Sequence, residues 1–193
     1  MYSIDEAVQK IIDLYDIYRC YINDGRWIMR EKMLNLLDEI NAEEMTDIDK
    51  LNAVSRKLTK KLPSVCPQSG EFIAYKVGDI SGDDDPYFHP VIIKLRIPAD
   101  AKRVGLYFKE EYFHKCRCNY AYVEEIKDFK SGEQLDEAHS ICSQPTGRVI
   151  YKVEKRVEAD WFQECPFDIC SHGIHFFMTE REARRYYSYE YEY

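Results

Sequence analysis

The sequence predicts an α+β protein in which an N-terminal helical segment precedes a mostly antiparallel sheet of about five strands and a C-terminal helix. Over residues 1–62, apolar side chains recur every three or four positions, which is the spacing of one helix face. Proline and glycine punctuate residues 63–70, and short runs of β-branched and aromatic residues follow. We therefore expect a helical segment at 1–62, a linker at 63–70, and an α+β domain with a tyrosine-rich tail at 71–193.

Three helices are predicted in the first segment. Ser3 and Glu6 form a capping box at the start of the first helix, and Gly25 is suited to its end. The second helix runs from about Trp27 to Asn41, and the third starts at Thr46. Short connections make neighbouring helices antiparallel, so a small bundle is expected. The side chains expected to face its core are Ile4, Val8, Ile11, Tyr15, Tyr18 and Ile22 in the first helix, Trp27, Met33, Leu34, Leu37 and Ile40 in the second, and Ile48, Leu51, Val54, Leu58 and Leu62 in the third.

Several segments after residue 70 have the composition of strands, with β-branched and aromatic residues bounded by turn-forming residues. The predicted strands are residues 72–77, 91–97, 120–126, 149–153 and 174–178. Thr179 and Glu182 form another capping box, which predicts a final helix through Tyr186 and Tyr187. Helices at both ends of a run of strands are typical of an α+β fold.

The charge of the chain argues against several function classes. Its 193 residues include 27 Lys and Arg against 35 Asp and Glu, so the formal net charge is 27 − 35 = −8. A general nucleic-acid binder, or a protein that coats anionic membranes, needs a positive surface. The sequence also contains no apolar run long enough to span a membrane and no pattern of a secretory leader. We expect a cytoplasmic protein that binds another protein and uses no cofactor.

Seven cysteines occur at irregular positions, and an odd number argues against the disulfide framework of a secreted protein. Cys116, Cys170 and His172 are the candidates for a structural zinc site, because thiolate and imidazole are ligands that zinc prefers. Their spacing matches no standard zinc motif. Buried thiols that act as small apolar side chains are therefore the favoured interpretation.

Tyrosine is the unusual component of the composition, with 16 residues against two tryptophans. Five of the tyrosines fall within the last eight positions, where glutamates separate them. Tyrosine offers a large contact area at little entropic cost, so this segment suits a protein-binding surface. Packing of the same side chains on the sheet is an equally favoured alternative. The candidate protein-binding residues are Tyr186, Tyr187, Tyr189, Tyr191 and Tyr193.

An ordered series of motifs in the second part of the chain carries a family resemblance. The series contains Ile97-Pro98-Ala99-Asp100-Ala101, Lys115-Cys116-Arg117, Trp161, the segment from Cys170 to Phe177, and Glu182-Ala183. Residues 71–187 resemble an uncharacterised domain family of phage, giant-virus and bacterial proteins that is often joined to pentapeptide repeats. The positions that match the family pattern are Tyr75, Lys76, Cys116, Arg117, Trp161, Cys170, Gly173 and His175. This family implies no activity, so the resemblance supports the fold class alone.

A second, shorter resemblance is to the middle motif of ADP-ribosyltransferases. Gly173 leads into a strand that contains His175, and a capped helix follows. The resemblance implies that His175 lies near a nicotinamide and that Tyr75 and Lys76 hold the ribose. The strand that carries the catalytic glutamate in that superfamily has no counterpart after this helix. The implied relative is therefore a degenerate, nucleotide-binding one.

The function that the sequence favours is a non-enzymatic protein-interaction module of phage or mobile-element type, for example one that inhibits a host factor. An acidic chain is complementary to the basic surfaces of proteins that handle nucleic acids. A nucleotide-binding or ADP-ribosyltransferase-like domain and a domain with structural zinc are the alternatives. The candidate ligand-binding residues are Tyr75, Lys76, Trp161, Gly173 and His175, and no residue is assigned a catalytic role.

Overall fold

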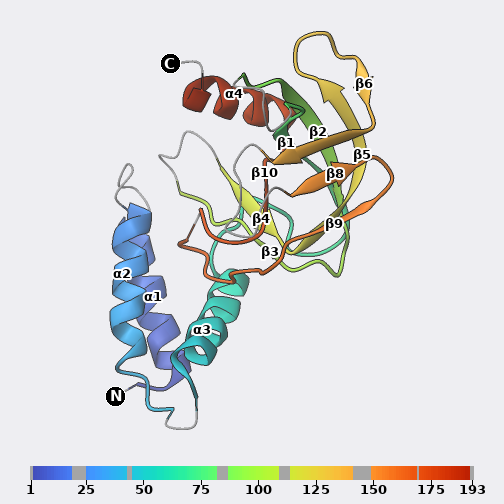
Figure 1. Ribbon diagram of the computed structural model, residues 1–193. Helices are drawn as coiled ribbons and strands as arrows, with labels where there is room; N and C mark the ends of the chain where they lie inside the picture. Colours follow the sequence, from blue (N-terminus) through green and yellow to red (C-terminus); the bar gives the residue numbers. More distant parts are fainter. Residues whose placement is uncertain are drawn as a thin grey trace. The chain divides into compact units, whose positions relative to one another are not determined.

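The computed structural model describes residues 2–18, 25–42, 45–81, 87–108, 114–140, 149–168 and 170–191 (Figure 1). The chain forms two compact units, each built from segments that are separate in the sequence. The helical unit consists of Met1–Gln68, Val104–His114 and Gln163–Ser171. The sheet unit consists of Ser69–Arg103, Lys115–Phe162 and His172–Tyr193. The division at residues 62 and 70 that the sequence suggests stays a prediction.

The predicted N-terminal helices are confirmed as α1 (Ile4–Tyr18), α2 (Gly25–Leu37) and α3 (Asp47–Lys61). Ser3 and Glu6 form the predicted capping box at the start of α1, where the Glu6 carboxylate accepts a hydrogen bond of 2.8 Å from the Ser3 backbone N–H. Apolar side chains from all three helices pack into one core. Burial of these apolar faces is what holds such short helices in place, because isolated helices of this length are marginal in water.

Three expectations for the helical unit are wrong, and a fourth cannot be compared. Gly25, expected just after the first helix, is the first residue of α2. Trp27 and Ile48, both expected to face the core, are 65% and 52% exposed. A periodic pattern assigns a side chain to a helix face, but it does not reveal whether that face is covered at the helix end. Ile22 lies outside the described residues.

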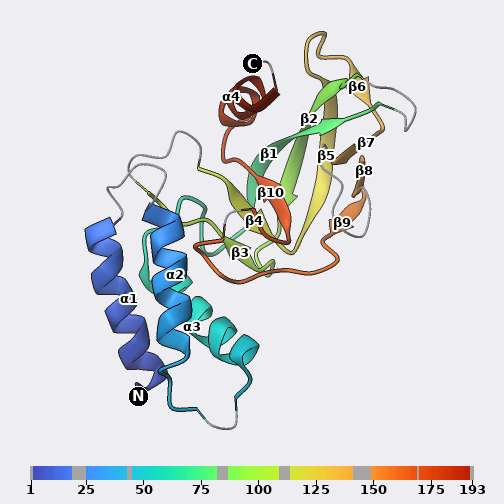
Figure 2. The same cartoon turned by 60° about the vertical axis from the view of Figure 1, so that its left-hand side comes forward.

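The larger sheet of the sheet unit has seven strands in the order β6-β5-β2-β1-β7-β8, with β9 also paired to β5. Its strands are β1 (Phe72–Asp79), β2 (Pro90–Ile97), β5 (Tyr120–Asp128), β6 (Gln134–Leu135), β7 (Glu137–Ser140), β8 (Ile150–Lys152) and β9 (Arg156–Glu158). The pairings among these strands are antiparallel, as predicted. The short connection from β8 to β9 returns the chain to β5, so the sheet curls (Figure 2).

A smaller sheet has the order β10-β4-β3 and contains β3 (Arg103–Val104), β4 (Cys116–Cys118) and β10 (Ile174–Phe176). The described residues therefore contain ten strands, where the sequence predicts about five. The additional strands β3, β4, β6, β7 and β9 are two to four residues long. Alternation over so few residues does not stand out from a loop, so the sequence underestimates the number of strands.

The predicted C-terminal helix is confirmed as α4 (Glu180–Tyr191), which Thr179 and Glu182 cap as expected. It lies against β1 and β2 (Figure 1) and buries Ala183 and Tyr187. Among the helices of the described residues, none combines the length and the apolar content that crossing a bilayer requires.

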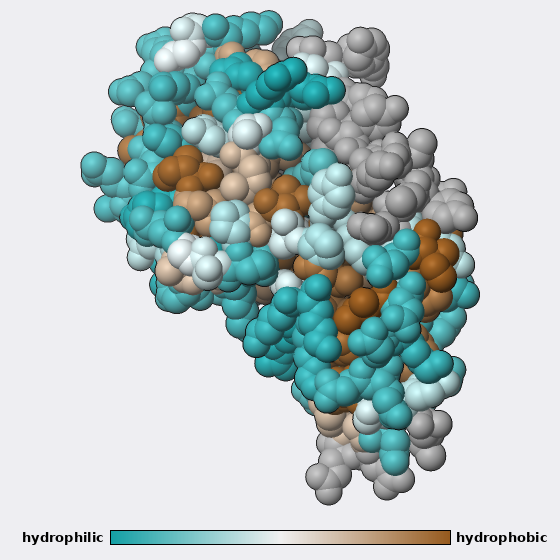
Figure 3. All heavy atoms as spheres, turned by 180° about the vertical axis from the view of Figure 1, so that it is seen from behind, coloured by the Kyte–Doolittle hydropathy of each residue, from teal (hydrophilic) through white to brown (hydrophobic). Residues whose placement is uncertain are grey.

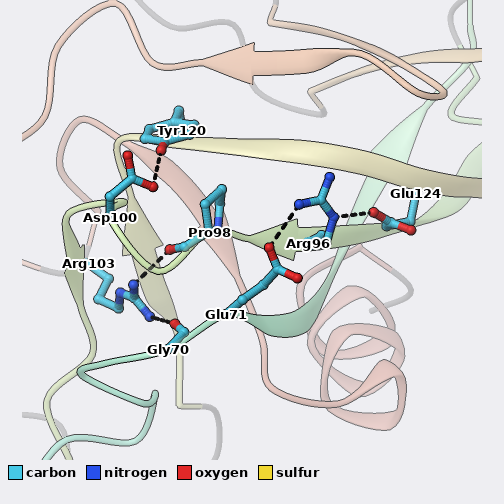
Figure 4. Close-up of polar contacts among 8 residues, drawn as sticks. All are labelled: Gly70, Glu71, Arg96, Pro98, Asp100, Arg103, Tyr120 and Glu124. Carbon is cyan, nitrogen blue, oxygen red and sulfur yellow. Dashed lines mark hydrogen bonds and ion pairs between the residues drawn. The ribbon is translucent and has the colours of Figure 1, made fainter.

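A buried arginine fixes the turn that follows β2 (Figure 4). Arg103 donates hydrogen bonds of 2.8 Å to the carbonyl groups of Gly70 and Pro98. Further bonds of 2.7 and 3.1 Å go to the carbonyl groups of Ala99 and Ala101. A buried guanidinium must have its N–H groups satisfied, and here backbone acceptors satisfy them. The segment between β2 and β3 is therefore held by side-chain bonds rather than by a sheet ladder.

Candidate functional site

The strands β4 and β10 bring several of the sequence-predicted residues side by side. They pair antiparallel, with His175 opposite Arg117 and Phe176 opposite Cys116. Because side chains alternate along a strand, His175 and Arg117 share one face of the small sheet, and Cys116 and Phe176 share the other. Cys116 and Phe176 are buried, so their face packs into the core of the sheet unit.

Arg117 fixes the backbone that leads into β10. Its side chain is among the largest fully buried ones, and Nη1 donates a hydrogen bond of 3.0 Å to the carbonyl of His172. The guanidinium carbon also lies 5.9 Å from the ring centroid of Phe162. A hydrogen bond from a charged donor is stronger than one between neutral groups. Loss of this bond would leave a buried charged donor without this acceptor, so the position of His172 is coupled to that of Arg117.

Gly173 allows the same segment to approach β4 closely. Its φ is +141°, a conformation that other residues rarely adopt. A Cβ at this position would lie 3.1 Å from the Phe162 ring, 3.3 Å from the Cys118 carbonyl oxygen and 3.4 Å from Cβ of Arg117. Glycine is required here both for its backbone conformation and for the space, which gives a physical reason for the motif that contains it.

A partly exposed group lies beside the start of this segment. It consists of Asp160, Trp161 and His172, and we call it the Trp161 site. The ring centroids of Trp161 and His172 are 4.7 Å apart at an interplanar angle of 58°. The Asp160 carboxylate accepts the backbone N–H of Trp161 at 2.8 Å, and the same oxygen lies 3.8 Å from Nδ1 of His172. Nδ1 is buried without a hydrogen-bond partner. Trp161 is 46% exposed.

Tyr75 and Lys76 do not form one site with each other. The backbone of Tyr75 exchanges hydrogen bonds of 2.9 and 2.7 Å with Phe177, which follows β10. Lys76 is the next residue of β1, so its side chain points to the opposite face of the strand. There Nζ lies 4.8 Å from the ring centroid of Tyr151, whose burial raises its pKa. A ribose held by both side chains, as the transferase resemblance implies, does not fit this arrangement.

The first two of the tail tyrosines pack within the sheet unit. The ring of Tyr186 lies 5.1 Å from that of Phe177, and its hydroxyl accepts a hydrogen bond of 2.9 Å from Lys115. Tyr187 is buried, with its ring 5.2 Å from that of Phe129. The side chains of Tyr189 and Tyr191, and the whole of Tyr193, lie outside the described residues.

The zinc candidates do not form a ligand set in the described part of the chain. Cys116 is buried in β4, whereas Cys170 is exposed and belongs to the helical unit. His172 contributes its ring to the Trp161 site. Across the described residues, no three His, Cys, Asp or Glu side chains gather as a metal ion requires.

Residues 62–183 match a family model described as a family of unknown function, DUF5758. This match covers more than half of the 193 residues. The chain belongs to the DUF5758 family. No curated protein and no solved structure matches it. The DUF5758 region includes the Trp161 site and the β4–β10 pair. It begins at Leu62, directly after α3, so the three N-terminal helices lie outside it.

Sequence reasoning found most of the residues in this part of the DUF5758 region but missed Asp160. Trp161, Gly173 and His175 are candidates, and the structure places His175 in β10, Gly173 directly before it, and the ring of Trp161 beside that of His172. Asp160 carries no spacing signal of its own. Only its position directly before an exposed tryptophan could have indicated it, and exposure is a property of the fold.

Proposed function

We propose that the chain is a non-enzymatic protein-interaction module and that Trp161 is its anchor residue. The observation that supports this is the 46% exposure of a large aromatic side chain whose ring contacts that of His172. Tryptophan is among the residues that contribute most of the binding energy at protein interfaces. An indole held half-exposed in a folded unit therefore has the chemistry of a docking residue.

The imidazole that the Trp161 indole contacts lies on a backbone segment that is held before any partner binds. Arg117 holds the carbonyl of His172, and the close approach of Gly173 to β4 holds the next residue. The imidazole of His172 in turn contacts the indole. Side chains that must be ordered on binding reduce affinity, so an aromatic group that is already positioned binds at lower entropic cost.

The setting of this module is part of the same proposal. We extend it to a phage or mobile-element origin, which the family resemblance implies, and to a position in the cytoplasm of a host cell and inhibition of a host factor. The net charge of −8 disfavours general binding to nucleic acid and favours a basic protein as partner.

The two alternatives receive less support from the geometry. A nucleotide site built on Tyr75, Lys76 and His175 would need the first two side chains on one face, and neighbours on a strand point to opposite faces. A zinc site would need ligands that the described residues do not bring together. The interaction module needs only an exposed aromatic residue, which Trp161 supplies.

The proposal is tested with two tryptophan variants of the full chain. Trp161→Ala removes the proposed anchor, and Trp27→Ala is the matched control, because Trp27 is 65% exposed but lies on α2 in the helical unit. Tagged wild type and both variants are expressed in the cells where the protein acts, cross-linked, and captured. Thermal unfolding of each purified variant first shows that both keep the fold.

The expected result is a specific partner that wild type and Trp27→Ala capture and that Trp161→Ala loses. Retention of this partner by Trp161→Ala would overturn the anchor role. Failure of the wild type to capture any protein in a reproducible, stoichiometric amount would overturn the interaction module itself.

A further inference from the structure

We infer that the groove between α1 and α2 is a self-association surface, on which two copies of the chain pack their α2 helices antiparallel. The inference concerns the helical unit and does not rest on the Trp161 site. The helices α1 and α2 lie side by side (Figure 2), and the groove between them has a volume of about 430 Å³. Its lining includes Lys10, Asp13 and Leu14 from α1 and Lys32, Leu36 and Glu39 from α2 and the turn that ends it.

The groove has an apolar component on each of its two helices. Leu14 and Leu36 are partly buried and pack against the core that the three helices share. Both leucines also line the groove. A third helix laid along the groove would remove the remaining exposed surface of these leucines from water, which favours association.

The charged side chains of the groove are balanced in sign. They are two lysines, Lys10 and Lys32, and two acids, Asp13 and Glu39, and all four are exposed. The formal charge of the lining is therefore 2 − 2 = 0, although the whole chain carries −8. A strongly basic or acidic partner is selected by a surface of one sign. A surface with both signs is complementary to a second copy of itself, because a two-fold axis brings different positions of the same surface together.

The spacing of Lys32 and Glu39 determines the orientation of the two copies. The two residues are 39 − 32 = 7 positions apart, about two helical turns, and both line the groove. In an antiparallel pair with the two-fold axis beside Leu36, Lys32 of each copy lies opposite Glu39 of the other, which gives two ion pairs. A parallel pair in register would place like charges opposite each other. Charge complementarity therefore selects the antiparallel arrangement.

The backbone that carries Glu39 is held within the helical unit. The carbonyl of Glu39 accepts a hydrogen bond of 2.7 Å from the N–H of Tyr2, and the N–H of Glu39 donates one of 3.2 Å to the carbonyl of Leu36. On the α1 side of the groove, Nζ of Lys10 lies 4.5 Å from the ring centroid of Tyr2. The turn after α2 is therefore fixed to the start of α1, so a second copy can pair with Glu39 without first ordering its backbone.

The experiment uses two charge reversals in the full chain, Lys32→Glu and Glu39→Lys. Each reversal places like charges at both symmetric contacts of the dimer, and both side chains are exposed, so the fold is expected to persist. Sedimentation equilibrium at physiological salt measures self-association of the wild type and the variants. We expect a reversible wild-type dimer with a dissociation constant in the micromolar range. Each variant is expected to dimerise at least about tenfold more weakly.

A mixture of the two variants tests the pairing itself. In a heterodimer of Lys32→Glu with Glu39→Lys, both contacts again join unlike charges, so the mixture is expected to dimerise about as tightly as the wild type. This recovery also shows that neither variant lost the dimer by unfolding. Lys60→Glu is the matched control, because it makes the same change in net charge as Lys32→Glu at an exposed position of α3, outside the groove. Its dimerisation is expected to change less than about twofold.

Four results would overturn the inference. A wild type that stays monomeric at millimolar concentration would remove the dimer, and equal weakening by Lys60→Glu would show an effect of net charge alone. A mixture that stays monomeric would refute the pairing. A dimer that both reversals leave unchanged would assign the contact to another face, such as the apolar band edged by hydrophilic side chains on the helical unit in the lower right of Figure 3.

Discussion

The hydroxyl of Tyr120 donates a hydrogen bond of 2.5 Å to the carboxylate of Asp100, which ties the first residue of β5 to the turn after β2 (Figure 4). This bond holds the pKa of Asp100 below its ordinary value and raises the pKa of Tyr120. The guanidinium of Arg156 lies over the Tyr120 ring at 4.0 Å. Tyr120 therefore joins the turn, β5 and β9 through one side chain.

Tyr120→Phe is expected to raise the pKa of Asp100 toward its ordinary value of 3.8, because the phenylalanine ring removes the donor that stabilises the carboxylate. The carboxyl carbon shift of Asp100, followed by NMR as pH is lowered, measures this pKa directly. Asp128 is the internal control, since the N–H of Ser131 lowers its pKa independently of Tyr120. An unchanged titration of Asp100 in the variant would contradict the assignment.

The parts of the fold that the sequence predicts well are the ones with local causes. The capping boxes at Ser3 and Thr179 are found where expected, because the hydrogen bonds of a capping box join residues only three positions apart. The long strands β1 and β2 and most of β5 also carry enough residues for their composition to identify them. Local sequence is sufficient for such elements.

The parts of the fold and of the candidate site that the sequence does not predict depend on contacts between distant segments of the chain. The short strand β9 exists because it pairs with β5, and nothing in its three residues indicates that pairing. The exposure of Trp27 likewise depends on what the neighbouring helices cover. Asp160 belongs to the candidate site only because the fold brings His172 beside Trp161. One part of the site was available from the sequence: alternation along a strand places Tyr75 and Lys76 on opposite faces.

Gly173→Ala is expected to destabilise the chain by about 1–3 kcal/mol, because the new Cβ meets backbone and ring atoms in a strained conformation. Urea unfolding of the wild type and the variant measures the loss. Gly132→Ala is the matched control, since Gly132 also has a positive φ, +73°, but its Cβ would meet nothing within 4 Å. The backbone conformation of Gly173, with φ +141°, is also less accessible to alanine than that of Gly132, so both strain and the close approach to β4 predict the larger loss at position 173. Equal losses in the two variants would contradict both causes.

Arg103 and Arg96 allow a comparison of buried and exposed guanidinium groups within one region (Figure 4). Arg103→Met is expected to cost about 2–4 kcal/mol, because several backbone carbonyls near it lose their donor. Arg96→Met removes ion pairs of 2.9 and 2.6 Å to Glu71 and Glu124, and it is expected to cost much less. Exposed ion pairs contribute little, since water screens them. Unfolding free energies of both variants at the same pH test this order, which would be wrong if Arg96→Met were the more damaging change.

Asp79 makes the unfolding free energy of the chain depend on pH in the acid range. Burial alone would raise the pKa of its carboxyl group, but hydrogen bonds from the side chain and N–H of Ser81 and from the N–H of His89, with the charge of His139, lower it. A group whose pKa is lower in the folded state stabilises the fold above its ordinary value of 3.8. That stabilisation is lost as the pH falls through the lower, folded-state value.

Asp79→Asn is therefore expected to reduce the unfolding free energy by about 1–2 kcal/mol at pH 7, because an amide accepts weaker hydrogen bonds than a carboxylate. As the pH falls below 3.8 and through the lower, folded-state pKa of Asp79, the wild type progressively loses the same contribution, so the difference between the two proteins becomes smaller. Urea unfolding at a series of pH values measures this difference, with Glu133→Gln as the control for net charge. A difference that stays constant from pH 7 to pH 2 would mean that Asp79 acts through packing, and that its hydrogen-bonded charge contributes nothing to the stability of the fold.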